Sequence, residues 1–352
     1  MKLRFFDERK KGEFYKTVRS SVMEEDAGER YILLRYKGSK PKTAFAEYLL
    51  ENLDKIKKRA RANKENIRSK NLVYEIEYPP GKQEKKSYII KMPDFDIMED
   101  REMSEQKARS IEHEFYSNVY LHELLEYPME YGFGEKERIV PLPSCLIFDQ
   151  KTNEIIFVRN SVINTPLSII AGERVSDVVA RNTILNTAIA LALFTRLGIH
   201  HDMHFANIGV DFSSNKCGVV FFDLENFIPI EWIKKTDVPE KIFSSLSSTL
   251  LVLIGVGIIR NVEQVEMFKD KYLEVNETWI LENNPEIIRA LNKKTPFASN
   301  DREIALYRAL TELRLKNLAK PAFWMPEEIT QRVMAALYFL WKAVRILTSG
   351  RV

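Results

Sequence analysis

The sequence has few cysteines, little net charge and no internal repeats. Among 352 residues only Cys145 and Cys217 are cysteines, and no CxxC spacing occurs. A disulfide framework and a cysteine-based zinc site are therefore disfavoured, and a reducing, cytoplasmic compartment is expected. The 53 basic and 50 acidic side chains leave a formal net charge of +3, so global charge does not indicate nucleic acid or a membrane surface as a partner.

Long apolar runs are also missing. The longest run, Leu250 to Ile259, is about half of what a helix needs to cross a bilayer, and it predicts a buried helix instead. The first residues, MKLRFFDERKKGE, contain no apolar stretch typical of a secretory signal. With 45% hydrophobic and 29% charged residues, the composition is that of a soluble globular protein with room for two lobes.

Strand patterns gather in the first half of the chain and helix patterns in the second. The predicted strands cover residues 13–19 and 31–36, which would form one hairpin, and then 71–78, 86–92, 145–149 and 154–159. Helices are predicted over residues 42–68, 104–126, 166–170 and 178–197, and over most of the chain after 231. Such segregated blocks predict an α+β fold with a β-rich N-lobe and a helical C-lobe. We expect a hairpin and basic helix in 1–70, the N-lobe proper in 71–160 and the C-lobe in 161–352.

Three polar side chains near the middle of the chain suggest a chemistry. Asp202 and Asn207 are five positions apart on a predicted loop, and Asp223 follows 16 residues later at the end of a short strand. Phosphoryl transfer needs Mg²⁺ held by oxygen ligands, and a carboxylate that accepts a hydroxyl proton. Asn207 and Asp223 can supply the metal ligands, and Asp202 can take the proton. A hairpin between Asn207 and Asp223 would hold these two side chains next to each other.

This pattern resembles the catalytic loop of the protein-kinase-like superfamily. His200-x-Asp202-x-His204-x-x-Asn207 is most similar to aminoglycoside- and choline-type small-molecule kinases, and the lack of an A-P-E motif also fits atypical kinases such as the RIO group. The resemblance is clear over about residues 143–228. It implies a two-lobed kinase-like fold, ATP and Mg²⁺ as cofactors, and a hydroxyl acceptor on a small molecule or a protein.

The resemblance also assigns roles to residues. It makes Asp202 catalytic and Asn207 and Asp223 the magnesium ligands. His200 and His204 are candidates for supporting roles, in which His200 would hold the loop by a backbone hydrogen bond. Glu225 would support the site as well, because Asp223-Leu-Glu225 resembles the D-x-E/D ending of small-molecule kinases and departs from D-F-G.

A kinase-like N-lobe further needs a strand lysine for the phosphates and a helix carboxylate that holds this lysine. Lys91, at the end of a predicted strand, is the candidate lysine. Glu112 is its predicted partner, because it lies at the apolar edge of the next helix in an E-x-x-F-Y pattern that resembles the corresponding kinase helix. Glu114 is predicted to point toward water. A rival pair, Lys37 with Glu47, would leave the helix over 104–126 without a place in the lobe.

Two further parts of a nucleotide site are harder to find. No glycine-rich loop is visible, and Gly28, in the first predicted turn, is the candidate to cover the phosphates. Backbone groups of residues 158–160 are expected to meet adenine. The basic stretch over residues 55–68 predicts a solvated helix end, with a site for an anionic partner as the alternative.

Several alternatives stay open at this stage. Without a glycine-rich loop, the chain could be a pseudokinase or a binding module that presents its basic helix to a partner. Transfer of AMP on a kinase-like fold is a third function. His200, His201 and His204 could also bind zinc if they lay on one helix, but the following residues read as a loop into a strand.

Overall fold

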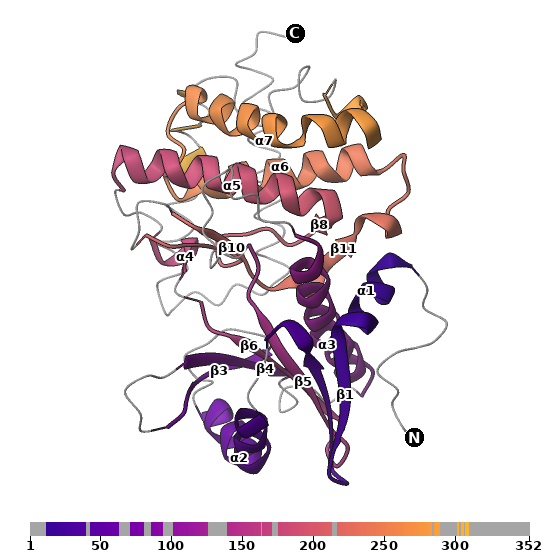
Figure 1. Ribbon diagram of the computed structural model, residues 1–352. Coiled ribbons are helices and arrows are strands. Elements are labelled where there is room, and N and C mark those ends of the chain that lie inside the picture. The colour runs from indigo at the N-terminus through magenta and orange to yellow at the C-terminus, as the bar shows by residue number, and fades with distance from the viewer. Residues whose placement is uncertain are drawn as a thin grey trace.

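A computed structural model describes most of the first 288 residues and a few beyond them. The described residues are 12–39, 43–62, 71–80, 86–93, 101–125, 139–162, 164–170, 175–212, 217–283, 285–288, 301–302, 304–305 and 307–309. The chain forms two lobes with a junction near the middle of the molecule (Figure 1). The predicted α+β architecture is confirmed, with a sheet-containing N-lobe and a helical C-lobe as the kinase resemblance implies.

The N-lobe is built on a six-stranded antiparallel sheet. Its strand order is β1-β2-β5-β6-β4-β3. The strands are β1 (Val22–Ala27), β2 (Tyr31–Tyr36), β3 (Asn71–Tyr78), β4 (Lys86–Pro93), β5 (Pro143–Asp149) and β6 (Glu154–Asn160). The four predicted strands from residue 71 onward are confirmed to within two residues at each end.

One helix covers each face of this sheet. Helix α2 (Thr43–Ala62) packs on the face that carries Leu33 and Ile147, and α3 (Arg101–Leu124) packs on the face that carries Leu34 and Leu146. Neighbouring residues of a strand point to opposite faces, so these strands are apolar on both sides. Figure 1 shows α2 below the sheet and α3 on the side that faces the C-lobe.

The first predicted strand is wrong. Residues Glu13–Ser21 form helix α1, and the first hairpin contains only β1 and β2. The buried residues of α1 are Phe14, Thr17, Val18 and Ser21, which recur at helical spacing. Aromatic and β-branched residues in α1 favour a strand locally, but packing against α3 stabilises the helix instead.

The C-lobe consists of helices with short strands between them and the sheet. The helices are α4 (Leu167–Ile170), α5 (Asp177–Leu197), α6 (Val238–Gly255) and α7 (Val262–Asn283). The strands are β7 (Thr165–Pro166), β8 (Gly198–His200), β9 (Ile208–Val210), β10 (Val219–Phe221) and β11 (Phe227–Pro229). By length and composition α5 and α6 could each cross a membrane, but most of both helices is buried inside the fold, as expected of core helices.

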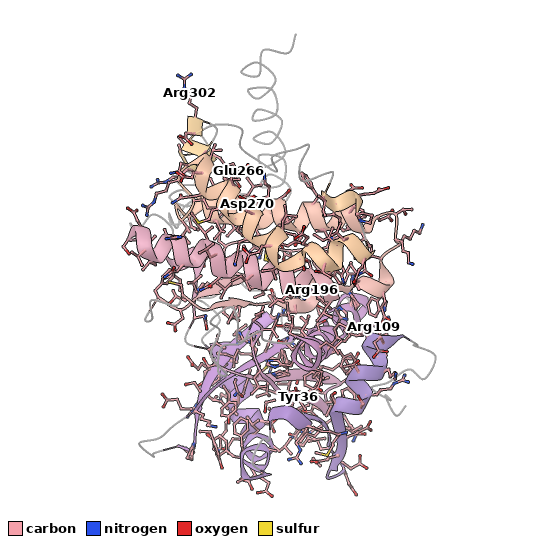
Figure 2. The ribbon with its side chains drawn as sticks, turned by 45° about the horizontal axis from the view of Figure 1, so that its top comes forward. Tyr36, Arg109, Arg196, Glu266, Asp270 and Arg302 are labelled. Carbon is pink, nitrogen blue, oxygen red and sulfur yellow. The ribbon has the colours of Figure 1, made fainter. Side chains whose placement is uncertain are left out.

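Polar contacts fix the end of α5 against α7. Arg196, labelled in Figure 2, donates a hydrogen bond from Nε to the side-chain oxygen of Asn276 at 2.7 Å and also contacts the backbone oxygen of Val275. Thr195 and Tyr272 share a buried hydrogen bond of 2.8 Å between their hydroxyl groups. The loop that follows α5 therefore starts from a fixed point.

The C-lobe also holds the N-terminal helix of the chain. Glu231, in the short 3₁₀ helix η6 (Ile230–Trp232), accepts hydrogen bonds of 2.8 Å from the backbone N–H groups of Glu13 and Phe14. Trp232 stacks on Tyr15 and on His113 of α3. Unpaired N–H groups at the start of a helix attract a carboxylate, so Glu231 links α1 to the C-lobe. Helix α3 is thereby held from both lobes.

Candidate functional site

Lys91 lies at the junction of the lobes and contacts three carboxylates. Its Nζ atom is 2.6 Å from Glu114 of α3 and 3.6 Å from Glu225, and it also contacts Asp223 directly. Only 11% of the Lys91 side chain is exposed. Burial opposes the charge, but the attraction of Glu114, Asp223 and Glu225 outweighs it and raises the pKa of Lys91. Lys91 therefore stays a cation at neutral pH.

The predicted pairing of Lys91 with Glu112 is wrong. Glu114, expected to face water, is buried, whereas Glu112 accepts a hydrogen bond of 2.6 Å from the hydroxyl of Tyr116. Helix α3 is buried on all sides from Glu114 to His122, so the apolar pattern does not separate an inward from an outward acid there. Asn118 and His122 share one side of the helix with Glu114, and this row of buried polar residues was the signal that a search for apolar positions overlooks. The rival Lys37 is exposed and donates to the backbone oxygen of Ser20.

The catalytic-loop candidates Asp202 and Asn207 are tied to each other and to Asp223. The side-chain nitrogen of Asn207 donates to the backbone oxygen of Asp202 at 2.7 Å, and the backbone oxygen of Asn207 accepts from Phe222 at 2.8 Å. Strands β9 and β10 pair antiparallel with Ile208 opposite Phe221. Asn207 and Asp223 therefore stand side by side, as the hairpin pattern predicts.

His200 holds this loop through both of its ring nitrogens. Its Nδ1 accepts from the backbone N–H of Asp202 at 3.1 Å, and its Nε2 lies 2.9 Å from the backbone oxygen of Phe222. Burial lowers the pKa of His200, so the ring is neutral with its proton on Nε2. Both nitrogens are engaged, which leaves no ligand atom of His200 for the zinc alternative.

Asp202 points to the solvent side of the site. Its side chain is 49% exposed, and one carboxylate oxygen lies 3.6 Å from Nε2 of His204. His204 is similarly exposed, and its Nδ1 accepts from the backbone N–H of Ala206 at 3.2 Å. A hydroxyl group of an incoming molecule can therefore reach the Asp202 carboxylate.

Asp223 adopts an unusual backbone conformation. Its φ of 55° and ψ of 57° fall in the left-handed region, where non-glycine residues are uncommon and often functional. Its neighbour Glu225 accepts a hydrogen bond of 2.8 Å from Ser110 of α3 and one of 3.4 Å from Asn71 of β3. The sharp turn at Asp223 thus brings two acids to Lys91 from one short segment.

The residues present suit a hard divalent cation. Carboxylate oxygens of Glu114, Asp223 and Glu225 lie within 4.8 Å of one another, and all three surround the Lys91 ammonium, so a metal ion could use them only where Lys91 gives them up. The amide nitrogen of Asn207 is engaged with Asp202, which leaves its amide oxygen as the atom that can meet a cation next to Asp223. Oxygen donors of this kind are the ligands that Mg²⁺ prefers.

A cleft of about 290 Å³ runs between the two lobes over these residues. Its lining includes the polar groups of Lys91, Glu114, Arg159, Asn207 and Asp223 and the apolar surface of Val73, Ile89, Val162, Pro166 and Phe222. The cleft therefore offers charged and apolar contacts together, which suits a ligand with an anionic part and a flat ring.

The backbone predicted to meet adenine is already occupied. Residues 158–160 pair with β4 and β5 in the sheet, and the N–H of Asn160 donates to Leu142. Ser161 likewise donates its N–H to Ser87. The cleft is lined instead by residues that follow β6, including Ser161, Val162 and Asn164.

Gly28 does not cover this cleft. It lies in the β1–β2 turn, at the edge of the sheet opposite β3, and Gln150 of the β5–β6 turn donates to Arg30 beside it. Strands β6, β5 and β2 separate this edge from β4 and Lys91. Gly28 is therefore wrong as the candidate for a phosphate-covering loop.

The basic helix differs in part from both predictions made for it. Lys57 is buried, donates to Asp149 at 2.8 Å and contacts Glu154, and Arg61 pairs with Glu154 at 3.1 Å. Lys57 is therefore neutralised inside the N-lobe and is not available to an anionic partner, whereas Arg61 is paired but exposed. Lys55, Lys58 and Arg59 are exposed, while residues 63–68 lie outside the described part of the chain.

Comparison with known proteins gives similar solved structures. No protein-family model matches the chain, and no curated protein matches its sequence. The structure of WaaP in complex with acyl carrier protein covers 72% of this chain and 88% of its own, with 11% identity and a TM-score of 0.37. The bifunctional kinase-methyltransferase WbdD covers 52% of this chain and 40% of its own, with 16% identity and a TM-score of 0.30.

A third similar structure is the pseudokinase domain of BIR2, an immune regulator of the RLK/Pelle family. It covers 75% of this chain and 82% of its own, with 13% identity and a TM-score of 0.30. Likenesses at these TM-scores do not establish a function, so the residues of the cleft have to supply the evidence.

Proposed function

We propose that this chain is a phosphotransferase that moves a phosphoryl group from a magnesium-bound nucleoside triphosphate to a hydroxyl acceptor. ATP is the donor expected from the resemblance to kinases. The observation that carries the proposal is the contact of buried Lys91 with Glu114 of the N-lobe and Asp223 of the C-lobe, in one cleft with Asn207. A cation fixed in this way is suited to hold phosphate oxygens.

Lys91 and Asp223 would change partners when a nucleotide enters. Asp223 now contacts Lys91 directly, and Glu114 holds the same ammonium from the other side. A phosphate oxygen would give Lys91 a new anionic partner and release the Asp223 carboxylate for the cation next to Asn207. Bound Mg²⁺ would neutralise the charge that builds up on the phosphates.

Asp202 would accept the proton of the acceptor hydroxyl. Its exposure leaves it open to an incoming molecule. Its backbone N–H donates to His200 and its backbone oxygen accepts from Asn207, which fixes the backbone that carries the carboxylate. A positioned carboxylate of this kind accelerates proton transfer by about 10²–10⁴-fold. We propose that the acceptor hydroxyl belongs to a small molecule or to a protein, and that the reaction takes place in the cytoplasm.

A pseudokinase is the second candidate, because of one observation. In the described part of the sheet β3 is the edge strand next to β4, and no glycine-rich hairpin of described residues lies over Lys91. A nucleotide would then be held with less cover than the resemblance implies. Binding without transfer is the outcome that this candidate predicts.

Intact-mass analysis tests the proposal after incubation of the full chain with Mg²⁺, ATP or GTP, and a panel of metabolites or protein extracts. Transfer of phosphate adds about 80 Da to the acceptor, whereas transfer of AMP adds about 329 Da. Asp202→Asn should reduce transfer by about 10²-fold or more. Asp237→Asn, on the exposed surface before α6, is the control and should leave it unchanged. Full activity of Asp202→Asn would overturn the assigned role.

A further inference from the structure

Arg159 places a second cation, besides Lys91, in the lining of the cleft. It lies on β6 opposite Ile89 of β4, two residue pairs away from Lys91, which is opposite Phe157. Arg159, Ile89 and Lys91 all line the cleft. The neighbours of Arg159 on the same strand, Phe157 and Val158, are buried and apolar, and the buried charges of this hairpin, Asp149 and Glu154, lie at its other end.

The guanidinium of Arg159 makes few polar contacts for its position. Among the described residues its hydrogen bond is a long one, 3.4 Å from NH1 to the backbone oxygen of its neighbour Asn160, and it takes part in no ion pair there. Its central carbon lies 5.6 Å from the centre of the Phe222 ring. Burial lowers the pKa of Arg159, although Glu114 and Asp223 act in the opposite direction. A partly buried group with five donors and one weak bond is suited to a ligand that brings acceptors.

The position of Arg159 decides which part of a nucleotide would supply these acceptors. Lys91, Asn207 and Asp223 mark the phosphate end of the cleft. Val73, Ile89 and Phe222 give the same cleft apolar surface against which a flat ring can pack. Arg159 is paired with Ile89 and lies 5.6 Å from the Phe222 ring centre, so the edge of a ring packed against these residues would come within reach of its guanidinium.

We propose that Arg159 reads the base of the nucleotide donor and selects a 6-oxo purine, guanine or hypoxanthine, over adenine. The inference rests on the proposed function, in which the cleft holds a nucleoside triphosphate. An arginine presents donors only, and its planar fork matches the two adjacent acceptors O6 and N7 of guanine. Adenine carries an amino group in place of O6, so it would set a donor against the donors of Arg159.

Binding of three nucleotides to the full chain tests this selection without any need for an acceptor. Dissociation constants are measured by calorimetry for the magnesium complexes of GTP, ITP and ATP. ITP keeps O6 and lacks the 2-amino group, so it isolates the contact with the keto oxygen. GTP and ITP should both bind about 10-fold more tightly than ATP.

Two variants at the same position sharpen the test. Arg159→Gln should move the preference toward ATP, because a glutamine amide can pair with N6 and N7 of adenine. Arg159→Lys keeps the positive charge but loses the two parallel N–H donors of the planar guanidinium. It should therefore reduce the preference for GTP and ITP. Thermal unfolding of both variants without nucleotide is also measured. A variant that unfolds like the wild type but has lost the preference between nucleotides has lost base selection and not its fold.

The possible outcomes are distinct. Equal weakening of all three nucleotides in Arg159→Gln would mean a phosphate-binding or packing role and would overturn the inference. Binding and use of ATP by the wild type with no preference for GTP or ITP would also overturn it, while the proposed function would stand. No binding of any nucleotide would overturn both.

Discussion

The ion pair between Lys91 and Glu114 governs the site at the scale of single residues. Glu114 is buried on α3 and is 2.6 Å from the Lys91 ammonium, so it limits where that ammonium can lie. Asp223, on the other side, contacts the same atom through a carboxylate that is one-third exposed. Glu114 therefore holds Lys91 in both the free and the nucleotide-bound protein, whereas Asp223 can leave Lys91 and bind a metal ion instead.

Glu114→Gln should lower phosphotransfer by about 10²-fold, because a displaced Lys91 no longer meets the phosphates in the right geometry. Glu112→Gln, two residues away on the same helix, is the matched control and should have little effect, since Glu112 pairs with Tyr116. Initial rates and nucleotide affinities of both variants check this. The reverse order, with Glu112→Gln the more damaging variant, would contradict the geometry.

Local spacing predicted some of these residues well and others poorly. Asp202, Asn207 and Asp223 lie within one loop and hairpin, so the short segment itself brings them together. Their chemical roles stay predictions. The partner of Lys91 depends on the rotation of α3 against the sheet, which tertiary packing determines, and Arg159 depends on the register between β6 and β4.

At the scale of elements, α2 is fixed to the sheet by a buried ion network. Asp149, whose side chain is 0% exposed, accepts from Arg30 at 2.8 Å and from Lys57 at 2.8 Å. Burial by itself would raise the pKa of Asp149, but the hydrogen bonds from Arg30 and Lys57 outweigh it and hold that pKa well below its usual range. A carboxyl group with a depressed pKa stabilises the folded state above its unfolded pKa, near pH 4, and loses this effect as pH falls further.

Asp149→Asn should therefore lower the free energy of unfolding at pH 7 by about 3 kcal/mol, because it leaves buried Lys57 with one partner fewer. The difference from the wild type should shrink as pH falls below about 4, where Asp149 of the unfolded wild type takes up a proton while the folded state, whose Asp149 pKa is depressed, still holds it ionised. Denaturant unfolding at several pH values measures both. Asp54→Asn is the control; this 68% exposed partner of Arg30 should cost at most about 1 kcal/mol. Equal costs at all pH values would rule out the network.

The helices and strands that were predicted correctly are those whose own residues determine them, without contacts to distant parts of the chain. Strands β3 to β6 alternate or run apolar between clear turns, and α5 is a long apolar helix, so their own residues identify them. Helix α1 was missed because its start is stabilised by Glu231, 218 residues away from Glu13. Lys57 was read as solvated because its partners, Asp149 and Glu154, come from a hairpin 92 and 97 residues further on.

For the whole molecule, the candidate site exists only where the two lobes meet. Lys91 and Glu114 come from the N-lobe, Asn207 and Asp223 come from the C-lobe, and the cleft lies between them. The contact of Glu231 with α1, and of Trp232 with Tyr15 and His113, joins the lobes on the side of α3 (Figure 1). Any ligand that bridges Lys91 and Asp223 should therefore stabilise the whole chain.

Thermal unfolding of the full chain with nucleotide and Mg²⁺, compared with nucleotide and EDTA, tests the central claim most directly. Both ATP and GTP are used, so that the identity of the base does not decide the result. At a concentration of about 100 times Kd, the account predicts a rise in Tm of about 5 °C for the wild type with Mg²⁺. It predicts a smaller rise in EDTA and no magnesium-dependent part in Asp223→Asn. An unchanged Tm in the wild type, or the same magnesium-dependent rise in Asp223→Asn, would contradict the account.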